Sequence, residues 1–159
     1  MNTNSRKRDA RSQTEGSGLN NPQGVTVTGR QAQEALQKLA PFFNRQQWHT
    51  LWDLCKNSEE KAYFRQMVRD LWARIAGMHG IYGQAGKGAE AIAYLHYFSA
   101  GFDWYITEKD IGDGTAQAFG LTVWAIEREL GYISIRELVA GSVELDLYWT
   151  PKTLAEIRR

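Results

Sequence analysis

The first half of the chain repeats apolar residues every three or four positions, which is the spacing of one buried helix face. Three such stretches follow one another between residues 28 and 78. Each begins at a residue whose side-chain oxygen can accept a hydrogen bond from the backbone three positions later, as in a capping box. The pattern therefore predicts three helices. The capping pairs are Thr28 with Gln31, Asn44 with Gln47, and Asn57 with Glu60.

The third predicted helix is the longest and runs from about Glu59 to Met78. Five glycines then interrupt the pattern between Gly77 and Gly88. Glycine loses more backbone freedom on ordering than any other residue, so this composition ends a helix and does not readily begin another. We interpret residues 81–90 as a glycine-rich linker or mobile loop.

From residue 91 the apolar positions alternate with a period of two, which is typical of strands. An Asp113–Gly114 pair between the second and third of these stretches predicts a hairpin turn. Ser134 can cap a short helix, and Pro151 favours the start of a terminal helix. The stretch before Pro151 shows the clearest alternation. The predicted strands cover residues 92–98, 104–107, 117–123, 130–135 and 143–149.

Helices followed by antiparallel strands predict an α+β fold: an N-terminal three-helix unit, an antiparallel β-sheet of about five strands, and short C-terminal helices. Almost nothing in the first 27 residues could be buried, which predicts a disordered tail. A flexible linker leaves open whether the helices pack on the sheet. The predicted organisation is a tail over 1–27, a helical unit over 28–80, the linker over 81–90 and a sheet domain over 91–159.

The composition fits one globular domain, because the chain has 159 residues of which 43% are hydrophobic. The apolar stretches are far shorter than the roughly 20 residues of a membrane-spanning helix, and the N-terminus is polar and arginine-rich. We therefore expect a cytoplasmic protein with no membrane partner. Cys55 is the single cysteine, which excludes an intrachain disulfide.

The formal net charge is only +1, but the charge is unevenly distributed. Basic residues outnumber acidic ones four to two over residues 1–27 and nine to six over 28–90, whereas acids lead ten to six over 91–159. The whole molecule therefore lacks the basic field that would draw it onto DNA, and any nucleic-acid contact should be one-sided.

Known cofactor and metal motifs fail on spacing. A Gly-Lys pair occurs at residues 86–87, but Ile81 stands where a phosphate-binding loop needs glycine and Gly88 where it needs Ser or Thr. None of the three histidines stands four residues from another, which excludes a helical two-histidine metal site. Cys55 lies in an apolar stripe and is interpreted as a core residue. We expect no cofactor and no metal.

Acidic residues crowd the segment that includes and follows the second predicted strand. Glu108 and Asp110 would share a face if the strand continued that far, which gives an acid/base pair as one alternative. A charged hairpin that keeps a sheet edge soluble is the simpler interpretation. We retain Asp103, Tyr105, Glu108 and Asp110 as a candidate surface motif.

A basic stripe marks the third predicted helix, where Lys61, Arg65 and Arg69 stand four residues apart. No acid stands four residues before any of them. The stripe is a candidate for binding phosphates or an acidic partner surface, with a solvated helix face as the simpler interpretation.

The second half resembles a family of small uncharacterised proteins, classed as a domain of unknown function, that conjugative plasmids, integrative elements and phages carry. The resemblance is strongest over residues 90–159, and it implies no catalytic residue. It implies a protein that serves a mobile element in a bacterial cytoplasm, by countering host defence or handling incoming DNA. The runs that carry it are residues 93–98, 103–108, 119–120, 129–138 and 144–154.

Three functions remain in competition. The first is a non-enzymatic accessory protein of a mobile genetic element that binds a host defence or DNA-processing protein, or a partner encoded by the element itself; it combines the resemblance with the absence of a recognisable catalytic constellation. The second is a nucleic-acid-binding accessory protein that uses the tail and the basic stripe. The third and least favoured is a metal-dependent nuclease, in which Glu108, Asp110 and a histidine meet in space.

Overall fold

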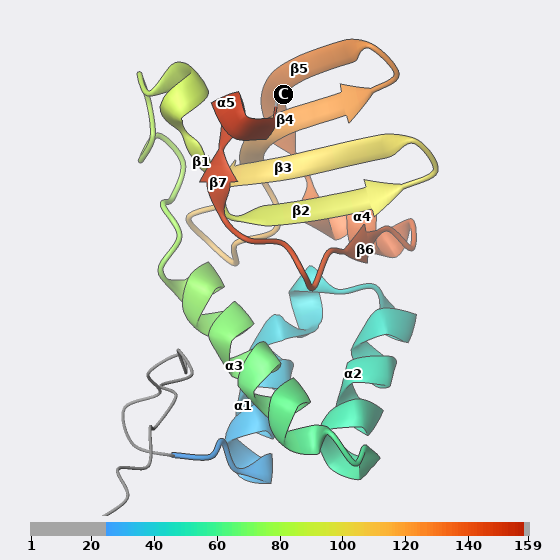
Figure 1. The fold of residues 1–159 in the computed structure, drawn as a ribbon. Helices are drawn as coiled ribbons and strands as arrows, with labels where there is room; N and C mark the ends of the chain where they lie inside the picture. Colours follow the sequence, from blue (N-terminus) through green and yellow to red (C-terminus); the bar gives the residue numbers. More distant parts are fainter. Residues whose placement is uncertain (1–24, 158–159) are drawn as a thin grey trace, which may run out of the picture.

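Three helices form one end of the molecule and an antiparallel sheet forms the other in the computed structural model, which describes residues 25–157 (Figure 1). This confirms the predicted α+β class with its three N-terminal helices, five-stranded sheet and short C-terminal helices. The helical end comprises α1 (Gly29–Leu39), the 3-10 turn η1 (Ala40–Phe42), α2 (Arg45–Asn57) and α3 (Lys61–Ala76).

Two of the three predicted helix caps are present. Thr28 and Gln31 form a reciprocal capping box at α1, and the Asn44 side chain accepts a hydrogen bond of 2.8 Å from the Gln47 N–H at α2. The predicted cap at Asn57 is wrong. Asn57 is the last residue of α2, and its amide donates to the Asp53 carboxylate one turn earlier, so α3 begins only at Lys61.

The five-stranded sheet is antiparallel throughout and has the strand order β5-β4-β3-β2-β6. A separate two-stranded ladder pairs β1 with β7. The elements after α3 are η2 (Gly88–Glu90), β1 (Ile92–Ala93), β2 (Leu95–Ser99), β3 (Phe102–Glu108), β4 (Ala118–Trp124), β5 (Glu127–Ile133), α4 (Ile135–Ala140), β6 (Glu144–Leu145), β7 (Lys152–Thr153) and α5 (Leu154–Ile157).

The stretch with the clearest alternation does not form the long strand that was predicted over 143–149. Only Glu144–Leu145 pairs with the sheet. Asp146 then starts a turn in which its carboxylate accepts the Tyr148 N–H and its carbonyl accepts the Trp149 N–H. The predicted start of the terminal helix at Pro151 is also wrong, because the chain first pairs with β1 and α5 begins at Leu154.

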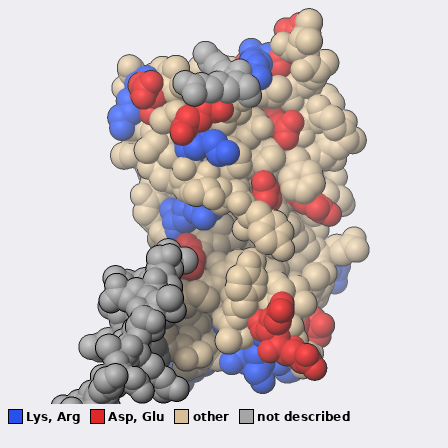
Figure 2. Space-filling view, viewed as in Figure 1, with Lys and Arg blue, Asp and Glu red and all other residues tan. Residues whose placement is uncertain are grey.

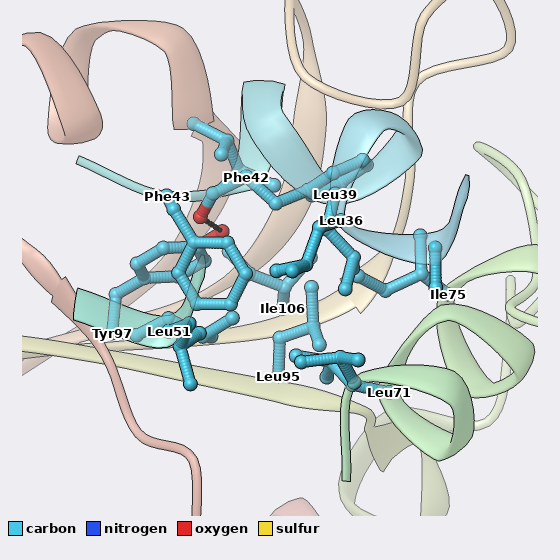
Figure 3. Close-up of a cluster of buried hydrophobic side chains, with 14 of the residues drawn as sticks. Leu36, Leu39, Phe42, Phe43, Leu51, Leu71, Ile75, Leu95, Tyr97 and Ile106 are labelled. Carbon is cyan, nitrogen blue, oxygen red and sulfur yellow. Dashed lines mark hydrogen bonds between the residues drawn. The ribbon is translucent and has the colours of Figure 1, made fainter. Parts of the chain in front are cut away.

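One continuous apolar core joins the helices to the sheet, which answers the question that the sequence left open. Figure 3 shows side chains from α1, η1, α3 and the strands meeting in a single cluster. Leu95, Tyr97 and Ile106 line the face of the sheet that meets the helices, here called the inner face. The Tyr97 hydroxyl is fully buried and donates to the Phe42 carbonyl at 2.7 Å, which ties β2 to η1.

The opposite, outer face of the sheet carries a second, smaller core under β1, β7 and α5. Leu121 and Tyr105 pack there against Trp149 and Leu154. In Figure 1 α5 and β7 lie in front of the strands. The α3–β1 segment runs to this side of the molecule, so the residues interpreted as a linker lie against the sheet.

The predicted tail falls largely outside the described residues, since the structure begins at residue 25. Val27, the last residue assigned to that tail, is buried in the main core. Val27 therefore contributes to the core, unlike the rest of the predicted tail that the structure describes.

Candidate functional site

A cavity of about 410 Å³ opens between the glycine-rich segment and the outer face of the sheet. We call it the outer pocket. Residues 81–91 form one side of it, β3, β4 and β5 form another, and Leu154 of α5 contributes a wall. A volume of this size and a mainly apolar lining with a few polar groups are typical of ligand-binding cavities.

Gln84 holds the glycine-rich side of the outer pocket in place. Its buried side-chain amide donates to the carbonyls of Ile92 and Thr107, both at 2.8 Å, and its carbonyl accepts the Ile92 N–H at 2.7 Å. Gly80 also forms a bridge with Lys109 beyond the end of β3. The segment 81–90 is thus anchored to β1 and β3 by specific hydrogen bonds and forms a wall of the pocket.

A β-bulge in β3 brings Glu108 to the outer pocket. Ile106 pairs with Gly120, but Glu108 pairs with Phe119, so one extra residue is inserted between them. Strict alternation would place Glu108 on the inner face with Ile106, whereas the bulge lets it line the pocket beside Phe119. Gly120 is required next to the bulge, because an added Cβ would overlap the Tyr105 carbonyl oxygen.

Glu108 is a buried carboxylate, only 5% exposed, in this mainly apolar setting. One carboxylate oxygen accepts the Gln84 N–H at 3.3 Å and the other lies 3.0 Å from the Thr107 hydroxyl. Among residues 25–157 no Lys, Arg or His forms a salt bridge with it. Burial of a carboxylate is costly unless it is hydrogen-bonded or paired with a positive charge, so the donors that reach Glu108 matter for its stability in the pocket.

The hydrogen bonds around Glu108 are fewer than the short distances suggest. The Thr107 hydroxyl lies within bonding distance of both the Glu108 carboxylate and the Phe119 carbonyl, at 3.0 and 3.1 Å. A hydroxyl carries one proton and donates it to one acceptor at a time. Whenever Thr107 donates to Phe119, the long bond from the Gln84 N–H is the one hydrogen bond to the carboxylate that residues 25–157 still supply.

Exposed aromatic residues form the rim of the outer pocket. Tyr82 is 73% exposed and Tyr132 is 54% exposed, and their hydroxyl oxygens are 3.4 Å apart. That hydrogen bond raises the pKa of the Tyr132 hydroxyl above its usual value. Leu130, also partly exposed, lines the same opening. The rim therefore presents a contiguous apolar and aromatic surface to solvent.

Tyr82 also has an unusual backbone, with a φ angle of 69°. Bulky residues rarely occupy this left-handed region, and the conformation costs on the order of 1 kcal/mol or more. Such strain persists where the surrounding structure holds it and clusters at binding sites. Here it turns a large aromatic side chain to the mouth of the pocket.

A second polar cluster lies elsewhere on the outer face and contains Asp103 and Tyr105 of the predicted motif. The His96 ring lies between two carboxylates, with Nε2 2.7 Å from Asp103 and Nδ1 3.0 Å from Asp146. It also stacks on Tyr105 with ring centroids 4.6 Å apart. Each ring nitrogen of His96 therefore faces its own carboxylate oxygen.

This histidine cluster holds the turn after β6 against the sheet. Asp146 supplies both a side-chain bond to His96 and a backbone bond to the His96 carbonyl. Burial raises the pKa of the Tyr105 hydroxyl, and the neighbouring Asp103 carboxylate raises it further. Both His96 nitrogens are occupied, so the cluster offers a ligand no free ring nitrogen.

Asp110 lies in a different environment from Glu108, in the loop that follows β3. Its carboxylate accepts the Gly112 N–H within its own loop. Asp113 in the same loop accepts hydrogen bonds from Thr115 and from Arg136, which hold the pKa of its carboxyl well below its usual range. The predicted motif is thus divided: Glu108 lies in the outer pocket, Asp103 and Tyr105 lie in the histidine cluster, and Asp110 lies in a surface loop.

The basic stripe on α3 is not three equivalent cations. Lys61 and Arg69 are exposed, but Arg65 is half-buried and donates to the Cys55 carbonyl at 2.9 Å, near the C-terminus of α2. Figure 2 shows one face of the molecule, on which basic and acidic groups adjoin at the end of α2 and the start of α3. Cys55 itself belongs to the core, and burial raises the pKa of its thiol.

Within residues 25–157 no group of three or more His, Cys, Asp or Glu side chains is arranged to hold a metal ion. None of the helices in this range is both long and apolar enough to cross a membrane. Sequence reasoning found Glu108 but missed Gln84, Tyr82 and Tyr132. For Tyr82 and Gln84 the one signal available was their position beside glycines in a segment that we interpreted as a linker, whereas Tyr132 lies in the predicted strand 130–135.

Comparison of the chain with protein-family models, with curated proteins and with solved structures gave no match in any of the three.

Proposed function

We propose that this chain is a non-enzymatic accessory protein of a bacterial mobile genetic element that binds a protein partner in the cytoplasm through the outer pocket. The partner belongs to host defence or to DNA processing. The mobile-element setting comes from the resemblance of residues 90–159 described above. The observation that carries the binding role is a cavity of about 410 Å³ whose rim exposes Tyr82 and Tyr132.

The chemistry of the rim supports a protein partner. Tyrosine is enriched at protein interfaces, because it adds a large apolar area and a hydroxyl at a low cost in side-chain freedom. Leu130 extends this surface, and the strained backbone of Tyr82 holds an aromatic ring where the partner would contact it. Residues that dominate a binding free energy tend to insert into desolvated pockets of this kind.

The test is capture of the partner from a lysate of a bacterial host by tagged full-length protein after nuclease treatment. We expect Tyr82→Ala and Tyr132→Ala to lose a protein that the wild type retains. Tyr148→Ala is the matched control, because Tyr148 is 78% exposed but does not line the outer pocket.

Two results would contradict the proposal. One is equal recovery of the partner by the wild type, both rim variants and the control. The other is recovery that depends on intact nucleic acid and weakens steeply with salt, as a phosphate-binding surface requires.

A further inference from the structure

We infer that the outer pocket takes a lysine side chain of the partner, whose ammonium group pairs with the Glu108 carboxylate. This inference rests on the proposed function and names the group that the partner inserts. Three features of the pocket carry it: the buried Glu108 carboxylate, which forms no salt bridge within residues 25–157, the apolar walls, and the aromatic rim.

The Glu108 carboxylate has acceptor capacity to spare. An ionised carboxylate offers about four lone-pair sites, and among residues 25–157 two donors lie within hydrogen-bonding distance of it, the Gln84 N–H and the Thr107 hydroxyl. An ammonium group carries three donors and a full positive charge. Its arrival would add hydrogen bonds to the remaining lone pairs and a counter-charge that no salt bridge within residues 25–157 provides, in a site where low polarity strengthens the attraction.

The walls suit the stem that carries the ammonium. Phe119, Leu130 and Leu154 line the cavity, and the four methylene groups of lysine can pack on such surfaces while the charged end reaches a polar group. The Tyr82 and Tyr132 rings at the rim can also attract a cation that passes over their faces.

Lysine fits this carboxylate better than arginine does. A guanidinium group binds carboxylates most strongly through two parallel hydrogen bonds to both oxygens. Each oxygen of Glu108 already faces a protein donor, so a paired approach competes with Gln84 and Thr107. A compact ammonium needs only one free direction. The acidic balance of residues 91–159 favours a cation in either case.

The test uses blocked lysine, N-acetyl-lysine N-methylamide, as the probe on the full-length protein. Amide chemical shifts of Gln84, Gly86 and Tyr132 report binding, and blocked norleucine is the control ligand because it has the same stem without the ammonium. We expect the wild type to bind blocked lysine at least tenfold more tightly than blocked norleucine, and to bind blocked arginine more weakly than blocked lysine.

Protein variants locate the effect. Glu108→Gln should remove the preference for lysine over norleucine, while Glu129→Gln, an exposed glutamate on β5, should retain it. Thermal unfolding of each variant checks that the fold is intact. If Glu108→Gln does not fold, the comparison of the ligands on the wild type decides by itself.

Equal affinity of the wild type for blocked lysine and blocked norleucine would overturn the inference, and so would an unchanged preference in folded Glu108→Gln. The proposed function fails separately. Loss of partner capture in the rim variants without lysine selectivity would retain the binding role and reject the lysine. Lysine selectivity without a captured partner would retain the lysine site and reject the proposed binding of a protein partner.

Discussion

The Gln84 side chain holds the glycine-rich segment 81–90 against β1 and β3, so that the segment forms one wall of the outer pocket. Its amide group forms three buried or partly buried hydrogen bonds to the backbone of Ile92 and Thr107, and the residue is only 4% exposed. Loss of the side chain would leave these buried backbone groups without partners, which is more costly than loss of a bond at the surface.

We therefore expect Gln84→Ala to lower the free energy of unfolding by about 3 kcal/mol, since three buried hydrogen bonds are lost at about 1 kcal/mol each. Urea-induced unfolding measures this change. Gln66→Ala is the control, because the exposed Gln66 amide bonds only to the Asp70 side chain and its loss should cost less than about 0.5 kcal/mol. Equal effects of the two substitutions would contradict the assigned role of Gln84.

Burial of the Tyr97 hydroxyl makes the stability of the folded protein depend on pH in the alkaline range. Its hydroxyl has an ordinary pKa of 10.0, and burial in the core raises it. A group with a raised folded pKa contributes stability below its unfolded pKa and loses it as the pH rises. Above pH 10 the unfolded chain ionises Tyr97 while the folded chain keeps it neutral, so the free energy of unfolding must fall.

Tyr97→Phe should reduce this alkaline loss. At pH 7 we expect the variant to be less stable by about 1 kcal/mol, because the hydrogen bond to the Phe42 carbonyl is lost. Between pH 10 and 11 the difference from the wild type should shrink, since phenylalanine does not ionise. Urea unfolding of the wild type and the variant from pH 7 to 11 measures the difference in their free energies of unfolding at each pH. A difference that stays constant or grows as the pH rises would refute this account.

At the scale of elements, α2 closes the edge of the sheet that β6 would otherwise expose. The Gln47 side chain accepts the Leu145 N–H at 3.0 Å and donates to the Leu145 carbonyl at 2.7 Å, so its amide bonds the edge as a neighbouring strand would. The Asn44 amide donates to the Val143 carbonyl close by. Free edges invite pairing with other chains, and here side chains occupy the edge.

Gln47→Ala should lower the free energy of unfolding by about 2 kcal/mol through the two lost bonds. It should also speed hydrogen exchange at the Leu145 amide, which loses its acceptor. Gln46→Ala, on the exposed side of the same helix turn, is the control and should leave the exchange rate unchanged. Protection of Leu145 that survives in Gln47→Ala would show that the edge is closed in another way.

At the scale of the whole molecule, the helices and the sheet share one core. Leu36, Phe42 and Ile75 from the helical half are buried in the same cluster as Leu95 and other residues from the strands. Two halves that bury each other's apolar surface are expected to unfold together, since separation exposes both surfaces to water.

The fragment of residues 91–159, which the sequence predicted to be a separate sheet domain, should therefore not fold by itself. Circular dichroism and amide proton dispersion of the isolated fragment check this, and the full chain should show a single unfolding transition by both helix and tryptophan signals. A fragment with native-like dispersion, or two separate transitions of the full chain, would show independent halves.

The helices and strands were largely predictable because they depend on local spacing. The stripe in α1 and the cap at Thr28 are short-range patterns, and so is the alternation along β2 and β3. The error at residues 146–149 has the same origin. Alternation indicated a strand, but the Asp146 carboxylate and carbonyl accept the N–H groups of Tyr148 and Trp149, which turns the chain. Hydrogen bonds between Asp146 and His96, which is 50 residues away, hold this turn against the sheet.

The candidate site was predictable only in part. Glu108 was identified as a candidate, but its burial depends on a bulge opposite Gly120 that the pattern of β3 does not predict. Tyr82 and Gln84 lie in a segment whose glycines indicate freedom, and only contacts with β1 and β3 order it. The spacing of the basic stripe on α3 likewise did not show that Arg65 donates a hydrogen bond to α2, because that bond joins two different helices.

The sequence by itself determined the α+β class, the three helices and the face that most strands bury, because these follow from residue spacing along a helix or strand. Tertiary structure alone decided that the helices and the sheet share a core. It also decided that Glu108 lies in the pocket on the outer face of the sheet, and that the glycine-rich segment forms a wall of that pocket. Those outcomes depend on hydrogen bonds and packing between residues distant in the chain, which the local pattern does not encode.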